Sequence, residues 1–118
     1  MSPNERDRVY VAHMLDCIER IFEYCENDER KFRSSRLVQD AVIRNLQTMA
    51  ESAQRLSDSS KALAPELPWR ALSGFRNVVV HDYLGLDLDS IWLVVANNLA
   101  PLRTGLERIS QGVSGSNP

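Results

Sequence analysis

The sequence predicts an all-α protein, an up-down bundle of four main helices. Apolar residues recur at steps of three and four along most of the chain, and no stretch shows the strict alternation typical of a strand. Proline and glycine interrupt this pattern at only a few places. The 118 residues are 43% hydrophobic and 25% charged, which is enough for one core but not for two. We therefore expect a single domain over residues 1–111.

The first helix is expected to begin at Pro3. Ser2 offers a side-chain oxygen to a free backbone amide, proline fits the first helical position, and Glu5 can return the bond. The apolar stripe that follows ends before Asn27; its members are Val11, Met14, Leu15, Ile18, Ile21, Phe22 and Cys25.

Three other side chains on this helix have reactive groups. His13 lies off the apolar stripe and has no visible partner, so we interpret it as a surface residue. Cys17 and Cys25 are eight residues apart, which separates them by roughly 12 Å along one helix, too far for a disulfide. We expect both thiols to be reduced core groups, with no zinc site, because no further Cys or paired His completes one.

A second long helix should follow a polar connector, around residues 28–32, that forms at most one helical turn. Its apolar face is wide, which suits a helix with several neighbours or a partner subunit; it comprises Leu37, Val38, Ala41, Val42, Leu46, Met49, Ala53 and Leu56. The run SDSSKALAPELP at 57–68 contains serines and two prolines. It should be a loop with at most a short turn of helix.

The third and fourth helices are expected in the second half of the chain. Pro68 fits the first position of the third, whose apolar side is Trp69, Leu72, Phe75, Val79 and Val80. Gly85 should end it, and Asp87 should cap the fourth. The fourth has a stripe from Leu88 to Ile109, and Pro101 should kink or split it near residues 97–100. Residues 112–118 have nothing to bury, so we expect a disordered tail.

Charge and hydropathy restrict the partners. The net charge of −2 gives no global basic field, so contact with a nucleic acid would need a local basic patch. The N-terminus is charged throughout, and no apolar run is long enough for a signal peptide or a membrane span. We therefore expect a cytoplasmic protein with no membrane association.

The stretch RNVVVHDY at 76–83 conflicts with its helical surroundings, because three consecutive valines favour a strand. On an ideal helix, Arg76 and Tyr83 lie about 20° apart, whereas His81 is rotated roughly 140° from Arg76. A straight helix therefore cannot direct all three at one phosphate. The chain leaves helical geometry near His81, or the same residues of a second subunit complete the site across a two-fold axis, or both.

These side chains suit RNA cleavage without a metal. The imidazole of His81 can accept the proton of a ribose 2′-hydroxyl or protonate the leaving oxygen, and Arg76 can stabilise charge on the phosphate. Tyr83 could donate to a phosphate oxygen, and Asn77 could orient ribose or phosphate, or bond across a dimer. The alternative is structural: a histidine and a tyrosine often cap carbonyls at a helix end, and an arginine is often only solvated.

With arginine, four residues, histidine, one residue and tyrosine, RNVVVHDY resembles the RX4HXY signature of the HEPN ribonucleases, and specifically of HepT-like toxins. The flanking text is similar to the family's segments in the same order: DAVIRNLQTMAESAQRLS at 40–57, LPWRALSGFRNVVVHDYLGLDLDSIW at 67–92, and NNLAPLRTGLERI near the end. The resemblance covers roughly residues 5–110. AESA at 50–53 departs from the glycine-initial segment that members often carry, and it touches no catalytic position.

The resemblance implies a homodimer whose cleft cuts cellular RNA as a metal-independent endoribonuclease, with no cofactor and with Arg76 and His81 as catalytic residues. It also implies a toxin-antitoxin pair, in which an MntA-like minimal nucleotidyltransferase silences the toxin by transferring AMP to Tyr83. A helical module that binds a nucleotide or a partner without catalysis is the alternative. The cations that guide RNA stay open among Arg30, Lys31, Arg33, Arg36, Arg44, Lys61 and Arg70. Arg70 is favoured, because it precedes Arg76 by six residues on the same predicted helix.

Overall fold

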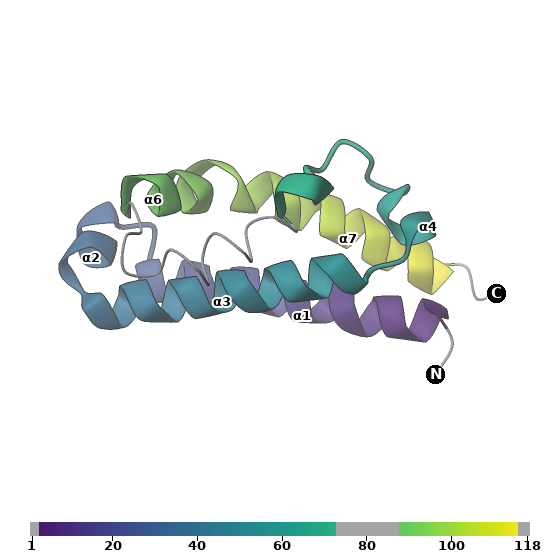
Figure 1. The fold of residues 1–118 in the computed structure, drawn as a ribbon, viewed down its shortest axis with the longest axis horizontal. Helices are drawn as coiled ribbons and strands as arrows, with labels where there is room; N and C mark the ends of the chain where they lie inside the picture. Colours follow the sequence, from purple (N-terminus) through teal and green to yellow (C-terminus); the bar gives the residue numbers. More distant parts are fainter. Residues whose placement is uncertain (1–2, 73–87, 116–118) are drawn as a thin grey trace.

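The protein is all-α over the residues that the computed structural model describes, 3–72 and 88–115 (Figure 1). Within these ranges the helices with both ends described are α1 (Pro3–Cys25), α2 (Glu29–Ser34), α3 (Arg36–Arg55), α4 (Asp58–Lys61), α6 (Leu88–Asn97) and α7 (Leu99–Gly115). Residues 69–72 are the helical start of a further element. The predicted fold class is confirmed. The predictions for residues 73–87, including the helix end at Gly85 and the cap at Asp87, lie outside the described residues.

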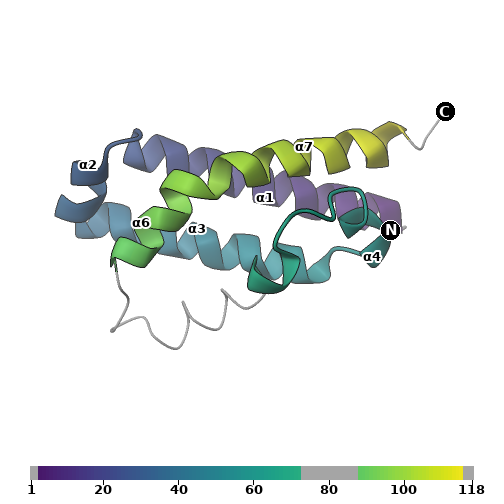
Figure 2. The same cartoon turned by 90° about the horizontal axis from the view of Figure 1, so that it is seen from above.

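The helices form an elongated bundle of 49 × 27 × 25 Å. α1 and α3 run antiparallel to each other, and α7 packs along α1 (Figures 1 and 2). α6 precedes α7 on the same side of the bundle, and its first turn faces α2. The long helices therefore surround one core, as the sequence predicted.

The core forms where the apolar stripes of α1, α3 and α7 meet. Its fully buried members include Met14, Ile18, Ile21, Phe32, Val42, Leu46, Leu99, Leu106 and Ile109. Cys17 and Cys25 are buried free thiols, as predicted, and His13 is exposed. Leu37 was wrongly assigned to the buried face of its helix. It is 80% exposed, whereas Val38, the next residue in the same turn of α3, packs against the core.

Local capping explains the turn between α1 and α3. Glu26 and Asn27 adopt left-handed φ values of 51° and 54°, which ends α1. Asp28 then accepts hydrogen bonds from the backbone of Arg30, at 2.9 Å, and of Lys31, and thereby caps α2. This helix is longer than the single turn expected, because the buried ring of Phe32 holds it against the core.

A buried carboxylate fixes the corner between α3 and α4. Asp7 of α1 is 3% exposed and accepts hydrogen bonds from the Ser57 amide at 3.2 Å, from the Ser57 hydroxyl, and from the Ser60 hydroxyl at 2.6 Å. Ser57 also caps α4, since its Oγ accepts from the Ser60 amide. The loop over 57–68 therefore contains the short helical turn expected of it.

The last helical stripe is split at Asn98, three residues before Pro101 and within the predicted range of 97–100. α6 ends at Asn97 and α7 begins at Leu99, while the amide of Asn98 donates to Val94 and that of Leu102 donates to Asn98. Pro101 has no N–H to continue this ladder. α7 then continues to Gly115, so residues 112–115, which we expected to be disordered, are helical. Part of the reason is a contact at Gly112, where the side chain of Leu63 covers the helix.

Candidate functional site

The predicted catalytic residues lie on the segment that the structure does not describe. Arg76, Asn77, His81 and Tyr83 all fall within residues 73–87. The two routes to a working site, local unwinding at His81 or a second subunit, therefore stay predictions. What the structure does describe is how the bundle holds the two ends of this segment, at Leu72 and at Leu88.

The first end is a turn that leads into a helix. The indole Nε1 of Trp69 donates to the carbonyl of Ala64 at 3.0 Å, and Leu67 between them is buried. The amide of Leu72 donates to the carbonyl of Pro68 at 2.9 Å, so a helical turn follows the proline. The prediction that a helix begins at Pro68 is correct to within one residue.

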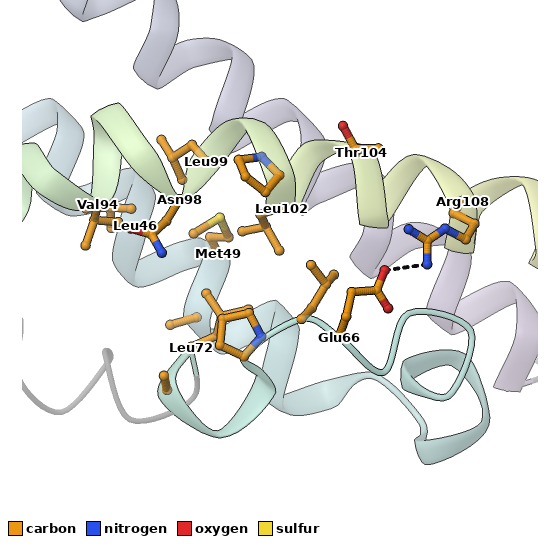
Figure 3. A pocket seen from close by; sticks show the side chains of 15 residues that line it. Leu46, Met49, Glu66, Leu72, Val94, Asn98, Leu99, Leu102, Thr104 and Arg108 are labelled. Atoms are coloured by element: carbon orange, nitrogen blue, oxygen red, sulfur yellow. Dashed lines mark ion pairs between the residues drawn. The ribbon is translucent and has the colours of Figure 1, made fainter.

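An arginine of α7 holds the same turn from the other side. Arg108 pairs with Glu66, and its Nη1 also donates to the carbonyl of Leu63 at 3.4 Å (Figure 3). The Glu66 carboxylate accepts hydrogen bonds from its own backbone amide and from Arg108, and these two bonds lower its pKa. Sequence reasoning missed this pair, because no local signal joins residues 42 positions apart.

The second end is held by α2. Arg33 makes a 2.6 Å contact through Nη2 with Asp89, in the first turn of α6, and a 2.7 Å contact through Nε with Glu29. These two hydrogen bonds, to Glu29 and to Asp89, raise the pKa of Arg33. One turn further along α6, the ring of Trp92 lies 5.6 Å from that of Phe32, tilted by 33°.

A pocket of about 480 Å³ lies between the first end and the bend from α6 to α7 (Figure 3). Apolar side chains line most of it, among them Leu46 and Met49 of α3, Leu72, and Leu102 of α7. Its polar lining is Glu66, Asn98, Thr104 and Arg108. An apolar wall with a few polar groups is typical of a small-molecule or nucleobase site.

The structure narrows the set of cations that could meet an RNA backbone. Lys31 pairs with Glu26 at 2.9 Å, Arg33 is shared by two carboxylates, and Lys61 lies 6.0 Å from the centre of the Trp69 ring. The remaining candidates have no ion pair with another described residue; they are Arg30, Arg36, Arg44 and Arg70. Arg70 is exposed in the helical turn at 69–72, and it is the one predicted site residue that the structure describes.

The described residues form neither a metal-binding cluster nor a membrane-spanning helix. In the described part of the chain, no group of three or more His, Cys, Asp or Glu side chains is placed to hold a metal ion. No helix of residues 3–72 or 88–115 combines the length and the apolar character needed to cross a membrane.

The helical bundle and the Arg76, His81 and Tyr83 spacing define the class, a small all-α protein of the HEPN kind. Residues 14–109 match the family model described as "Ribonuclease HepT-like". The chain therefore belongs to the HepT-like ribonuclease family, which confirms the resemblance drawn from the sequence.

Two relatives illustrate the range of the family. A protein of Thermococcus cleftensis named "Probable ribonuclease HepT" is 30% identical over 104 residues, which cover 85% of this chain and 92% of the relative. A Methanocaldococcus jannaschii protein named "Gamma-glutamylcyclotransferase and putative RNase" is 30% identical over 105 residues, 88% of this chain. The chain spans about half of that relative, 47% of its length. No solved structure matches the chain significantly.

Proposed function

We propose that this protein is a metal-independent endoribonuclease toxin that cleaves cellular RNA in the cytoplasm. The observation that carries the proposal is the family match over residues 14–109, which spans an intact arginine, histidine and tyrosine signature at Arg76, His81 and Tyr83. A solvated arginine and a helix-capping histidine would have no need of this spacing. The family membership therefore favours the catalytic interpretation over the structural one.

The proposed reaction uses the RNA's own 2′-hydroxyl as nucleophile. His81, as a neutral imidazole, accepts the proton while the 2′-oxygen attacks phosphorus and the 5′-oxygen leaves; an imidazolium protonates that leaving oxygen. Arg76 donates charge-assisted hydrogen bonds to the phosphate oxygens as negative charge accumulates on them. Asn77 and Arg70 support the reaction by orienting the ribose and holding the flanking backbone. None of these steps requires a metal.

Two copies of the chain complete this site in the proposal. A single histidine cannot be base and acid at the same moment, but two copies of His81 facing one cleft can share the tasks. The rotation of roughly 140° between Arg76 and His81 on a straight helix gives a second reason for a shared cleft. We therefore propose a homodimer with the catalytic cleft at its interface.

Control of the activity is proposed to act at Tyr83. An MntA-like minimal nucleotidyltransferase, acting as antitoxin, would transfer AMP from ATP to the phenol oxygen and release pyrophosphate. The added phosphate would occupy the position that an RNA phosphate needs, with Arg76 as its counter-charge. A phenol has a pKa near 10, so a partner enzyme is needed to deprotonate it.

The test is cleavage of total RNA in EDTA by purified protein, free of any nucleotidyltransferase, with mass spectrometry of Tyr83. We expect fragments with 2′,3′-cyclic phosphate ends from the wild type, and none from His81→Ala or Arg76→Ala. His13→Ala and Arg55→Ala are the matched controls, because both residues are exposed and lie on other helices. Cleavage that persists in both site variants would rule out the assigned residues. Light scattering tests the dimer separately.

A nucleotide-binding module without catalysis is the second candidate, and the pocket of about 480 Å³ favours it. Its size suits a nucleobase, and Asn98 and Thr104 offer hydrogen bonds at its wall. If unmodified wild type cuts no RNA but binds AMP in calorimetry, and Leu102→Trp abolishes that binding, the module is the better description. RNA cleavage unaffected by Leu102→Trp would exclude a catalytic role for the pocket.

A further inference from the structure

The pocket of about 480 Å³ has an apolar floor and a polar rim (Figure 3). Buried side chains form its floor, namely Leu46, Met49, Leu67, Leu99 and Leu102. The polar residues of its lining are all exposed; they are Glu66, Asn98, Thr104 and Arg108. The main chain of a peptide would lose its hydrogen bonds to water on such a floor. A flat ring with polar groups only at its edge suits both the floor and the rim.

The charges of the rim neutralise each other. Glu66 and Arg108 form an ion pair, and Arg108 also donates to the carbonyl of Leu63. The rim therefore has no unpaired charge that could accompany an ion into the pocket. A phosphate or an ammonium group on the apolar floor would lose its hydration without compensation, so the group that enters must be uncharged. A nucleobase meets this condition at neutral pH.

Two side chains of the rim can bind the edge of a base. The carboxamide of Asn98 makes no hydrogen bond with another side chain or backbone group in the described ranges, so both its donor and its acceptor are open. The hydroxyl of Thr104 donates to the carbonyl of Ala100 at 3.2 Å, which leaves its oxygen as an acceptor. Base edges carry donors and acceptors side by side, and asparagine is one of the residues that bind them in pairs.

Arg70 places one open cation beside this uncharged pocket. It is exposed, and it forms no ion pair or hydrogen bond within the described part of the chain. The next residue, Ala71, lines the pocket. Consecutive Cα atoms are about 3.8 Å apart, so the long side chain of Arg70 can reach a phosphate just outside the pocket. An uncharged cavity next to a cation matches a nucleotide, whose base is uncharged and whose phosphate is anionic.

We propose that this pocket is a subsite for one unpaired base of single-stranded RNA, with Arg70 on the adjoining phosphate. The inference rests on the proposed function, because it describes how the RNA of that function is held. It involves only described residues and requires no contact with residues 73–87. A base within a duplex is stacked and paired and cannot enter, so the subsite selects single strands.

The binding experiment uses fluorescence anisotropy with two short strands of equal length and charge. One is a single-stranded 2′-O-methyl RNA, which cannot be cleaved because its 2′-oxygen has no proton; the other is the same backbone without bases. We expect the wild type to bind the first about 5- to 100-fold more tightly, the effect of holding one base. Asn98→Ala should lower this ratio about threefold or more, because the hydrogen bonds to the base edge are lost.

Asn97→Ala is the matched control for Asn98→Ala. Both asparagines are exposed and adjacent, but only Asn98 lines the pocket. The ratio should therefore stay at the wild-type value in Asn97→Ala. Leu102→Trp fills the pocket and should abolish the preference for bases, with circular dichroism to check its fold; if it does not fold, the asparagine pair decides. A preference that is equal in Asn98→Ala and Asn97→Ala would overturn the inference.

Arg70→Gln tests the phosphate contact separately. It should weaken binding of both strands by the same factor and lower the salt dependence by about one ion, because a phosphate contact is indifferent to the base. Arg8→Gln removes an exposed cation from α1, which contributes no residue to the pocket, and should change neither strand. Equal affinities of Arg70→Gln and Arg8→Gln would contradict the assigned role of Arg70.

These results are independent of catalysis, since the 2′-O-methyl strand cannot react. If the wild type cuts no RNA but its preference for bases is lost in Asn98→Ala, the proposed nuclease activity fails and the subsite stands. If the wild type cuts RNA but binds both strands equally, the nuclease activity stands and the subsite is refuted.

Discussion

Asp7→Ala should destabilise the protein by about 3 kcal/mol at pH 7, although Asp7 touches no predicted site residue. Its carboxylate is 3% exposed and accepts hydrogen bonds from the amide and hydroxyl of Ser57 and from the hydroxyl of Ser60. Ser60 is itself 3% exposed. In Asp7→Ala, the Ser60 hydroxyl and the Ser57 amide would have no hydrogen-bond acceptor in the interior.

The magnitude comes from those two donors. An unsatisfied buried donor costs about 1–3 kcal/mol, and a value near 1.5 for each gives about 3 kcal/mol. The Ser57 hydroxyl adds little, because Ser57 is only half-buried and can turn toward water. With an unfolding entropy of about 2.1 cal/mol/K per residue over 118 residues, the melting temperature should fall by about 12 °C.

The assay is urea and thermal unfolding followed by circular dichroism, at pH 7 and at a series of acidic pH values. Burial alone would raise the pKa of Asp7, but the hydrogen bonds from Ser57 and Ser60 outweigh it and hold the pKa below its ordinary value. A depressed folded-state pKa means that the stabilisation is complete above the unfolded value of about 3.9 and is lost as the pH falls through the folded value. The difference in the free energy of unfolding between the wild type and Asp7→Asn should therefore decrease only below about pH 4.

Asp16→Ala is the control, because Asp16 lies on the same helix and its 3.0 Å ion pair with Arg20 is exposed. Such a pair contributes about 0.5 kcal/mol or less. If the free energies of unfolding of Asp7→Ala and Asp16→Ala differ by less than about 1 kcal/mol, the three hydrogen bonds of Asp7 do not stabilise the corner between α3 and α4.

Three further changes test the packing. Phe32→Ala should lower the free energy of unfolding by about 3–5 kcal/mol, because the ring is fully buried against α6. Leu37→Ala, at an 80% exposed position, should change this free energy by less than about 0.5 kcal/mol. Equal urea midpoints for the two variants would contradict the core assignment. Asn27→Val should cost about 1–2 kcal/mol in the same assay, since a β-branched residue is disfavoured at φ 54°, whereas Asn27→Gly should not destabilise. Cys17 and Cys25 should react with Ellman's reagent only after urea is added, because burial raises the pKa of both thiols; rapid labelling of the native protein would disprove their burial.

Much of the fold could be predicted from local signals in the sequence. Caps and breakers act over one helical turn, so the start at Pro3, the stop before Asn27 and the split within residues 97–100 could be located within one or two residues. The periodicity of apolar residues also identified the buried side of α1 and α7. It misplaced Leu37, because a pattern of apolar residues does not show which of two adjacent apolar residues, Leu37 or Val38, packs against the core.

The long-range polar contacts could not be predicted in the same way. Asp7 is 50 residues from Ser57, and Glu66 is 42 residues from Arg108. Each member of these pairs is an ordinary polar residue in its own surroundings. Their pairing depends on the order in which α1, α3 and α7 pack, which one sequence does not specify. The signature itself was readable because RX4HXY is a local spacing, whereas the arrangement that would let it work is not local.

The two ends of the segment 73–87 are each held by a helix that is distant from that end in the sequence. Its first end is held by α7, through Arg108, while its second end is held by α2, through Arg33 on Asp89. α2 precedes the segment in the sequence and α7 follows it, and each also packs on the rest of the bundle. A peptide covering residues 66–92 would contain every signature residue and neither support. Both supports of segment 73–87 therefore exist only in the completed bundle, where Arg108 meets the turn before the segment and Arg33 meets Asp89 after it.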